Sequence, residues 1–459
     1  MKHKSFLFIT LCMVMCLIPS VGMLFFPTTQ TTENRAMAPA PKLVTEAGNL
    51  NLKFFQDFES WFTEHIALRN QLVYTDARIQ SGIFGESNVS GVIRGSDGWL
   101  YYSSTLSDYL GQDVMTSREL YNLAHNIRLV EDYAHNRDMG FVFTIAPNKN
   151  TLYDEHMPYH RSLIVNPDHS AKLLAPYLEG SHYLDLFEMF ENTDEILYLK
   201  RDSHWNNKGA YLAYNGLMDA LHLPHEAYSS TVPALVKNEN GDLNKMLYSF
   251  YGPLEENYNY SLPQNYTYEK EDATVEDGWI VTNNKAGHGK LLMFRDSFAN
   301  TLIPFLSNEF QTAYYSKGMP NALERFVENY GPDHIVIQKV ERNISEYLEN
   351  PPILTPPVEV LPSEVRIRQT DTTVQIAPCE NDVNYYTIRG TLDENYLEDH
   401  SEILVAVNGT LYQAYQTGEN GYLMYLKTAG FTGEKAVFHV YIVNGDSCVQ
   451  VLYETLDLP

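Results

Sequence analysis

Two residues near the middle of the sequence have the types and spacing of an acid–base pair. Asp202 and His204 stand in a polar segment before residues 210–221, where the apolar spacing predicts an amphipathic helix. In an extended segment, side chains two residues apart project to the same side. A carboxylate there can hold one ring nitrogen of the histidine and leave the other free to take a proton from a nucleophile. Asp202 or Ser203 could equally cap the helix, so this pair alone leaves both roles open.

A serine follows an apolar run further along the chain. Residues 290–294 have the pattern of a buried strand, and Ser297 stands just beyond it, before a possible helix over residues 301–310 that Pro304 interrupts. Many α/β enzymes expose a nucleophilic serine in this way, on a sharp turn between a strand and a helix. The turn amides then lie where an oxyanion would form, although an ordinary capped helix has the same pattern. Together the two segments supply a serine, a histidine and an aspartate.

The order of these motifs along the chain resembles that of a known family. The main matches are three motifs: Gly95-Ser-Asp-Gly-Trp-Leu-Tyr101, Asp202-Ser-His204-Trp205 and Arg295-Asp-Ser297-Phe298. They are similar to motifs of the alginate O-acetyltransferase group of SGNH hydrolases, and more narrowly of its Asp-His-His-Trp relatives in Gram-positive bacteria. The shorter matches are Glu33–Arg35, Ala146–Lys149, Tyr153, Gly241–Leu243 and Glu341–Asn343. The resemblance therefore spans roughly residues 33–343.

The resemblance implies roles for six residues, and the sequence departs from the family pattern at two positions. Ser203 stands where the family name expects a second histidine, and Arg295 stands where many SGNH serine motifs have glycine. Neither departure removes a triad member, but an arginine there would alter the oxyanion pocket. The implied catalytic residues are Ser297, His204 and Asp202, and the candidates for oxyanion or substrate contacts are Arg295, Asn300 and Lys149.

By this resemblance, the protein is expected to be an extracytoplasmic, membrane-anchored O-acetyltransferase that needs no cofactor. An acyl-serine would pass its acetyl group to hydroxyls of a cell-surface or exported polysaccharide. Because acetyl-CoA is made inside the cell, the expected partner is a membrane-bound O-acyltransferase that supplies the acetyl group. Two alternatives stay open: an SGNH carbohydrate esterase (a deacetylase) with the same triad, and a non-catalytic envelope protein that binds glycan.

Length and charge narrow the class of protein. A chain of 459 residues is too long for one ordinary core, so two or three domains are expected. The net charge of −26 argues against a nucleic-acid partner, which favours basic surfaces.

The sequence has no glycine-rich phosphate-binding loop. His156 and His160 have a metal-ligand spacing, but Pro158 stands between them and no metal site is predicted.

The first 28 residues have the pattern of a membrane anchor. Lys2 and Lys4 precede an uncharged run from Phe6 to Phe26, which is long enough to cross a bilayer as a helix. A cleavable signal peptide would have a shorter apolar core. We therefore expect an uncleaved single-pass anchor in residues 1–28, with the remainder of the chain outside the cell membrane.

Three further regions follow from the hydrophobic pattern. Residues 29–90 are expected to hold a linker and one or two helices, whose aromatic residues between Phe54 and Phe62 we place in a core. In residues 91–350, short apolar strands alternate with helices after an Asp97-Gly98 hairpin. This predicts a three-layer α/β/α domain with a mostly parallel sheet. A helix in this region starts at Ser117 without a capping box in its sequence.

The C-terminal region has the composition of a separate β domain. A proline-rich stretch over residues 351–362 predicts a stiff hinge, and seven alternating runs predict a β-sandwich over residues 358–459. Carbohydrate-binding modules of some family members share this architecture, although a fold does not fix a function. Cys379 and Cys448 both lie here, and the sequence leaves their pairing open.

Overall fold

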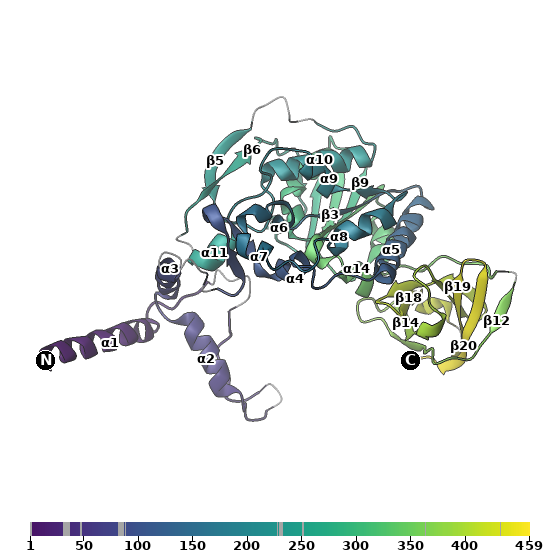
Figure 1. Cartoon of the computed structure of the whole chain (residues 1–459), viewed down its shortest axis with the longest axis horizontal. Coiled ribbons are helices and arrows are strands. Elements are labelled where there is room, and N and C mark those ends of the chain that lie inside the picture. Colours follow the sequence, from purple (N-terminus) through teal and green to yellow (C-terminus); the bar gives the residue numbers. More distant parts are fainter. Residues whose placement is uncertain are drawn as a thin grey trace.

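The computed structural model describes residues 2–30, 37–45, 48–80, 87, 89–226, 228, 233–249, 252–362, 364–431 and 433–459. An α/β domain lies in the middle, with three helices at one end and a β-rich C-terminal region at the other (Figure 1). The helices at the N-terminal end are α1 (Lys2–Gly22), α2 (Phe54–His65) and α3 (Arg69–Ile79).

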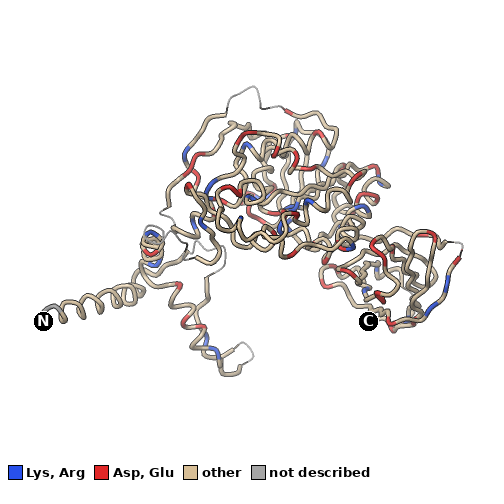
Figure 2. Tube along the Cα trace, in the orientation of Figure 1, with Lys and Arg blue, Asp and Glu red and all other residues tan. Residues whose placement is uncertain are grey.

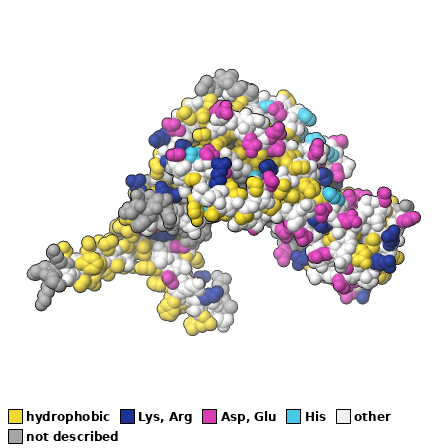
Figure 3. Space-filling model, viewed as in Figure 1, with side chains coloured by type: hydrophobic (Ala, Val, Ile, Leu, Met, Phe, Trp, Pro, Cys, Tyr) yellow, Lys and Arg dark blue, Asp and Glu magenta, His cyan; other side chains and the backbone are white. Residues whose placement is uncertain are grey.

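Among the described residues, α1 is the one helix that is long and apolar enough to cross a membrane. Its span Ser5–Gly22 carries no charged residue (Figure 2), and hydrophobic side chains cover it along its length (Figure 3). By length and composition it suits a signal anchor or a signal peptide.

The aromatic residues of α2 do not lie in a core, and that expectation is wrong. Phe58 stacks on Phe54 and Phe62, but Phe55 is 83% exposed and Phe58 42% exposed. Within this helix only Glu64 is buried. The periodicity correctly predicted an apolar face, but the helix extends away from the α/β domain, which therefore does not cover it (Figure 1).

The central sheet is mostly parallel, as expected. Its strand order is β4-β3-β11-β9-β10-β8-β7, in which neighbours are parallel from β4 to β10 and antiparallel beyond. The strands are β3 (Gly140–Ala146), β4 (Tyr183–Leu184), β7 (Thr267–Tyr268), β8 (Trp279–Asn283), β9 (Lys290–Phe294), β10 (Thr312–Ser316) and β11 (His334–Val340).

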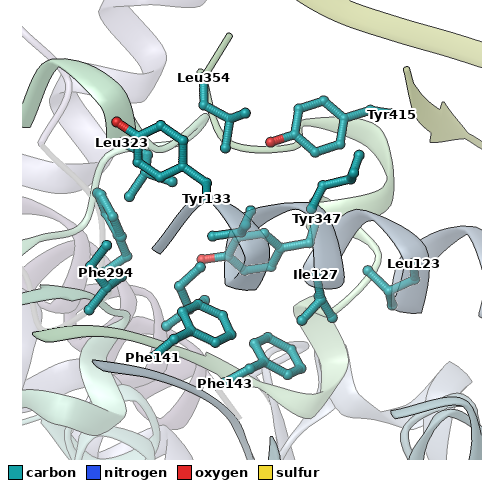
Figure 4. Close-up of a cluster of buried hydrophobic side chains, with 14 of the residues drawn as sticks. Leu123, Ile127, Tyr133, Phe141, Phe143, Phe294, Leu323, Tyr347, Leu354 and Tyr415 are labelled. Carbon is teal, nitrogen blue, oxygen red and sulfur yellow. The ribbon is translucent and has the colours of Figure 1, made fainter. Parts of the chain in front are cut away.

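Helices cover both faces of this sheet. One face packs against α5 (Ser117–His135), α8 (Ser170–Leu174), α13 (Leu323–Tyr330) and α14 (Glu346–Glu349). The other packs against α9 (Leu186–Glu191), α10 (Asn207–Ala220) and α12 (Ile303–Glu309). Figure 4 shows the first core, where Ile127 of α5 lies near Phe143 of β3. Because successive strand residues point to opposite faces, strands in such a sheet are apolar throughout.

Shorter elements surround these layers. The expected hairpin consists of β1 (Val92–Arg94) and β2 (Leu100–Tyr102), with Asp97 and Gly98 at positive φ in its turn. The remaining strands and helices of this region are α4 (Leu106–Tyr109), α6 (Lys149–Leu152), α7 (Pro158–Arg161), β5 (Ala234–Glu239), α11 (Asp242–Tyr248) and β6 (Glu255–Asn259).

Two helix starts differ from the sequence-based expectation. Thr116, one residue before α5, accepts a hydrogen bond from the Glu119 amide, and the Glu119 side chain accepts one from Thr116, so a capping box is present. Pro304 lies in the first turn of α12 and does not interrupt it. A missing N–H costs nothing there, because first-turn amides have no intrahelical acceptor.

The C-terminal region consists of two facing sheets around a shared core. One sheet has the order β12-β20-β19-β15-β16, and its strands are β12 (Val365–Ile367), β15 (Glu402–Val407), β16 (Thr410–Gln413), β19 (Lys435–Asn444) and β20 (Ser447–Asp457). The other has the order β13-β14-β18-β17, with β13 (Gln375–Pro378), β14 (Tyr385–Thr391), β17 (Tyr415–Thr417) and β18 (Gly421–Lys427).

The strands β16 and β17 were not among the seven expected. One chain segment forms both, because it leaves the first sheet at Ala414 and joins the second. Each part is too short to show the alternation of a strand. Cys379 and Cys448 are buried free thiols in different hydrophobic clusters.

The proline-rich stretch is not a free hinge. Its first residues, Pro351 to Leu354, are buried, and Leu354 belongs to the same core cluster as Tyr415 of the β-rich region. Asn126 of α5 also pairs with the backbone of Gln416 in the edge strand β17, through hydrogen bonds of 2.8 and 2.9 Å. The first prolines, Pro351 and Pro352, are therefore part of a packed contact between the two regions.

Candidate active site

The serine, the histidine and the aspartate meet in one hydrogen-bonded chain. The Ser297 hydroxyl donates to His204 Nε2 over 2.8 Å, and His204 Nδ1 donates to Asp202 Oδ1 over 2.6 Å. Asp202 Oδ1 also accepts from the His204 amide at 2.9 Å, which fixes the two residues relative to each other. The helix cap of α10 is Asn206, so the alternative role of Asp202 or Ser203 as this cap is excluded.

The turn that carries Ser297 is held at the carboxyl end of β9. Asp296 caps the short 3-10 helix Ser297–Thr301 by accepting from the Phe298 amide, and its other oxygen accepts from the Val340 amide at the end of β11. Side chains at the carboxyl ends of neighbouring parallel strands lie at one edge of the sheet. This arrangement exposes the serine at that edge.

Aromatic contacts join the histidine segment to the serine turn. The Trp205 indole donates to the Thr301 hydroxyl over 2.7 Å, and the Phe298 ring lies 4.8 Å from the His204 ring between centroids. Phe298 and Trp205 themselves are almost fully buried. Tertiary packing therefore brings together two residues that are 93 positions apart in the chain.

Neighbouring carboxylates control the protonation of the histidine. Burial lowers the pKa of His204, but the charges of Asp202 and then Asp242 raise it, and the net pKa lies above the ordinary value. Burial raises the pKa of Asp202, but the adjacent His204 and two backbone amides hold it well below the usual range. The ionised Asp202 therefore stabilises the imidazolium that forms when the neutral His204 ring takes the serine proton.

The structure does not bring Lys149 to the serine. Its buried ammonium group donates to the carbonyl oxygens of Leu199, Lys200 and Asp202 at 3.1, 3.1 and 2.5 Å. Burial lowers the pKa of Lys149 to about 8. An ammonium group has three protons, so Lys149 supports the loop that carries Asp202 and has no proton left for a substrate.

Arg295 and Asn300 bind a neighbouring loop. The guanidinium of Arg295 donates to the carbonyl oxygens of Val275 and Asp277, and to the side-chain oxygen of Asn300 at 2.5 Å. The Asn300 amide nitrogen donates to Glu276 at 3.0 Å. Burial lowers the pKa of Arg295 to about 10. The side-chain oxygen of Asn300 thus binds Arg295, and one of the two protons on its amide nitrogen binds Glu276.

Asp242 is a site residue to which the sequence assigned no role. Its carboxylate accepts from the amide and the hydroxyl of Ser203, and its Oδ2 lies 3.7 Å from His204 Nδ1. The available sequence signal was the family-like motif Gly241–Leu243, which gave no partner for Asp242.

In the part of the chain that the structure describes, three groups of histidines and carboxylates have ligand atoms within 4.8 Å of one another. They are Asp202-His204-Asp242, Asp108-His169-Glu341 and Glu131-His135-His182. The pKa of Asp108 is raised to about 7, first by burial and then by the charge of Glu341. In each group a histidine nitrogen is already paired with a carboxylate, which explains the arrangement without an ion.

A parallel sheet covered on both faces, with the serine turn beside a histidine–aspartate pair, defines an SGNH-hydrolase-like α/β domain. Residues 92–286 match the family model described as the SGNH hydrolase-like domain of the acetyltransferase AlgX. The resemblance to this family is therefore confirmed for a segment that contains Asp202 and His204 and ends before Ser297. The match supports an acyl-transfer enzyme.

Solved structures to which this chain is similar come from several bacteria. The structure of Bacillus cereus PatB1 has 17% identity and a TM-score of 0.44, covering 55% of this chain and 96% of that chain. A DHHW family protein from Eubacterium siraeum has 15% identity and a TM-score of 0.41, covering 56% and 93%. Pseudomonas aeruginosa AlgX has 13% identity and a TM-score of 0.34, covering 80% and 91%. No curated protein matches the chain.

Proposed function

We propose that this protein is an extracytoplasmic O-acetyltransferase that moves an acetyl group, through an acyl-serine, to hydroxyls of a cell-surface or exported polysaccharide. The observation that carries the proposal is the chain of hydrogen bonds from Ser297 through His204 to Asp202. These hydrogen bonds lie in a protein whose residues 92–286 match an acetyltransferase family model.

In the first half of the reaction, the Ser297 oxygen attacks the acetyl carbonyl while its proton moves to His204 Nε2. The bond between the carbonyl carbon and the donor oxygen then breaks, and His204 returns the proton to the leaving group. In the second half, His204 takes the proton of a sugar hydroxyl. That oxygen forms the new ester bond, and the freed Ser297 oxygen takes the proton back.

Arg295 and Asn300 have a conditional role in this proposal. The Asn300 amide nitrogen carries two protons and donates one to Glu276, so only its second proton is available to an oxyanion. The Phe298 amide is occupied by Asp296, which leaves the neighbouring turn amides as the first donors to test. Lys149 acts at a distance, by holding the carbonyl of Asp202.

The proposed organisation along the chain has four parts. Residues 1–28 anchor the protein in the membrane, and residues 29–90 connect this anchor to the catalytic domain. Residues 91–350 form the catalytic domain, and residues 358–459 form a β-sandwich that contacts the glycan. The apolar helix α1 supports the anchor. A membrane-bound O-acyltransferase that exports acetyl groups is the proposed donor, because the site lies outside the cytoplasm in this arrangement.

One observation favours a second function, that of a carbohydrate esterase. Ser297 and His204 are partly exposed, so water can reach the same acyl-serine. Water and a sugar hydroxyl would both give their proton to His204 Nε2. The two functions therefore differ in their product, which is acetate for the esterase and acetylated sugar for the transferase.

The test uses the full chain in detergent with a chromogenic acetyl ester. Intact mass and peptide mapping should find an acetyl group on Ser297, with faster loss when oligosaccharide is added and acetylated sugar as the product. We expect no adduct in Ser297→Ala or His204→Ala, and a normal adduct in Ser162→Ala, which alters an exposed serine. Release as acetate alone would favour the esterase. A folded protein without any adduct would contradict both functions.

A further inference from the structure

A second carboxylate faces the ring of His204 on the side away from Ser297. Asp242 Oδ2 lies 3.7 Å from His204 Nδ1, the nitrogen that already donates to Asp202 at 2.6 Å. Asp242 is the first residue of α11 and is 40 positions away from Asp202. The imidazole therefore has two acidic neighbours at Nδ1 and the nucleophile at Nε2.

Asp242 is tied to the catalytic segment in both directions. Its Oδ1 accepts from the Ser203 amide at 2.7 Å and its Oδ2 from the Ser203 hydroxyl at 2.5 Å. In return, the Asp242 amide donates to Asp202 Oδ2 at 2.8 Å. Each carboxylate is thus oriented by the segment that carries the other, and the serine that replaces the expected histidine joins the two.

The backbone at the start of α11 packs closely against the segment that carries Asp202. A Cβ atom on Gly241 would lie 2.3 Å from the Arg201 carbonyl oxygen and 2.8 Å from the Asp202 amide nitrogen. The backbone N–H of Asn244 also donates to the Arg201 carbonyl, at 3.0 Å. Only glycine permits this approach, which places Asp242 against residues 201–203.

The charges around His204 favour its protonated form. Asp202, Asp242 and Asp296 act on the ring, while the ammonium of Lys149 lies behind the Asp202 backbone. Burial and the negative charge of Asp202 raise the pKa of Asp242, because both disfavour its ionised form. A positive charge on the imidazole relieves this repulsion.

We infer that Asp242 is a positioning residue of the triad, which holds the Nδ1 proton of His204 in place through Ser203 and stabilises the imidazolium that forms when Ser297 attacks. The inference deepens the proposed function and rests on it for its activity readout. Its physical readout, the titration of His204, is independent of any substrate.

The test is an NMR titration of the 15N-labelled histidines in the full chain, with His204 assigned by a His204→Gln variant. Asp242→Asn keeps an oxygen for the Ser203 amide and removes the charge. We expect the pKa of His204 to fall by about one pH unit, the lower end for an opposite charge within ~4–6 Å. Asp457→Asn, which removes an exposed charge in β20, should leave it unchanged. An unchanged pKa in a folded Asp242→Asn variant overturns the inference.

Circular dichroism shows whether each variant folds. If Asp242→Asn does not, Asp242→Ser supplies a smaller oxygen acceptor and is expected to give the same shift. The acidic limb of kcat/KM on the acetyl ester should move down by the same amount as the NMR pKa. If the pKa moves but no variant and no wild-type protein turns over the ester, the proposed function fails and the positioning role of Asp242 stands. If activity is present and neither the pKa nor the limb moves, only the inference fails.

Discussion

At the scale of single residues, one imidazole controls the proposed chemistry. His204 must be neutral at Nε2 to take a proton from Ser297, yet its environment favours the charged ring. The neighbouring carboxylates make His204 a stronger base than a solvated histidine. They also shift the pH range over which it can act as a base to higher pH.

The pH dependence of activity follows from this balance. Because the pKa of His204 is raised above its ordinary value of about 6.5, protonation should stop catalysis at a higher pH than for a solvated histidine. We expect kcat/KM on an acetyl ester to fall as the pH drops through a value above about 6.5. A pH–rate profile of the wild-type protein measures it, and a midpoint well below this value would contradict the raised pKa.

The supporting role of Lys149 predicts a loss of stability. In Lys149→Met, three backbone carbonyls lose a buried donor, so the free energy of unfolding should fall by about 1–3 kcal/mol, with activity reduced as well. Denaturant titration gives the first quantity and ester turnover the second. Lys172→Met, at an exposed lysine paired with Asp168, is the matched control. A stable, inactive Lys149→Met variant would instead indicate direct contact with substrate.

At the scale of elements, α5 links the α/β domain to the β-rich region. Its buried polar residues bind the outer edge of β17 and the residue after it, whose backbone groups would otherwise be unpaired. Arg118 extends the same contact with hydrogen bonds to the carbonyls of Glu398 and Glu419.

Removing the side chain of Asn126, which binds Gln416 of β17, should destabilise the protein. In Asn126→Ala, the buried N–H and C=O of Gln416 lose their partner, and we expect the free energy of unfolding to fall by about 1–3 kcal/mol. Asn395→Ala removes an exposed side-chain hydrogen bond to Asp393 and should change it far less. Equal losses in the two variants, measured by denaturant titration, would mean that the α5–β17 contact contributes little.

At the scale of the whole molecule, the same contact predicts acid sensitivity. Burial lowers the pKa of His125 in α5 to about 4, so the folded protein keeps this ring neutral where the unfolded chain protonates it. The unfolded state therefore gains a proton first as the pH drops. Stability is full above about pH 6.5 and declines toward pH 4, by about 3 kcal/mol if no other group compensated.

The measurement compares unfolding free energies at several pH values in wild type and His125→Gln. Glutamine does not titrate and still offers a donor for the Ala414 carbonyl, to which His125 now donates. Between pH 6.5 and 4, the free energy of unfolding should fall less in His125→Gln than in wild type. Carboxylates elsewhere affect both proteins alike. Parallel curves over that range would contradict the lowered pKa.

Much of the fold was predictable from local patterns. The strands that became β3, β9 and β11 are mostly apolar runs next to helices, a pattern that fits a parallel sheet covered on both faces. The turn at Asp97-Gly98 was equally clear, because its positive φ values favour these residue types. These features depend on neighbours within a few positions.

Features that depend on what covers an element were not predictable in this way. The aromatic face of α2 looked like core but is exposed, and the prolines before Leu354 looked like a hinge but are buried. Hydrophobic spacing shows that a face is apolar, and only the tertiary arrangement shows whether another element reaches it.

By itself, the sequence determined the class of domain, the apolar N-terminal helix and the residue types for a serine–histidine–aspartate site, since these follow from composition, periodicity and motif order. Only the tertiary structure decided that Ser297 and His204 lie 2.8 Å apart, that Lys149 supports a loop and that Asp242 faces the histidine. Hydrogen-bond geometry between residues 40 to 93 positions apart depends on how whole elements pack, and local chemistry does not encode that packing residue by residue.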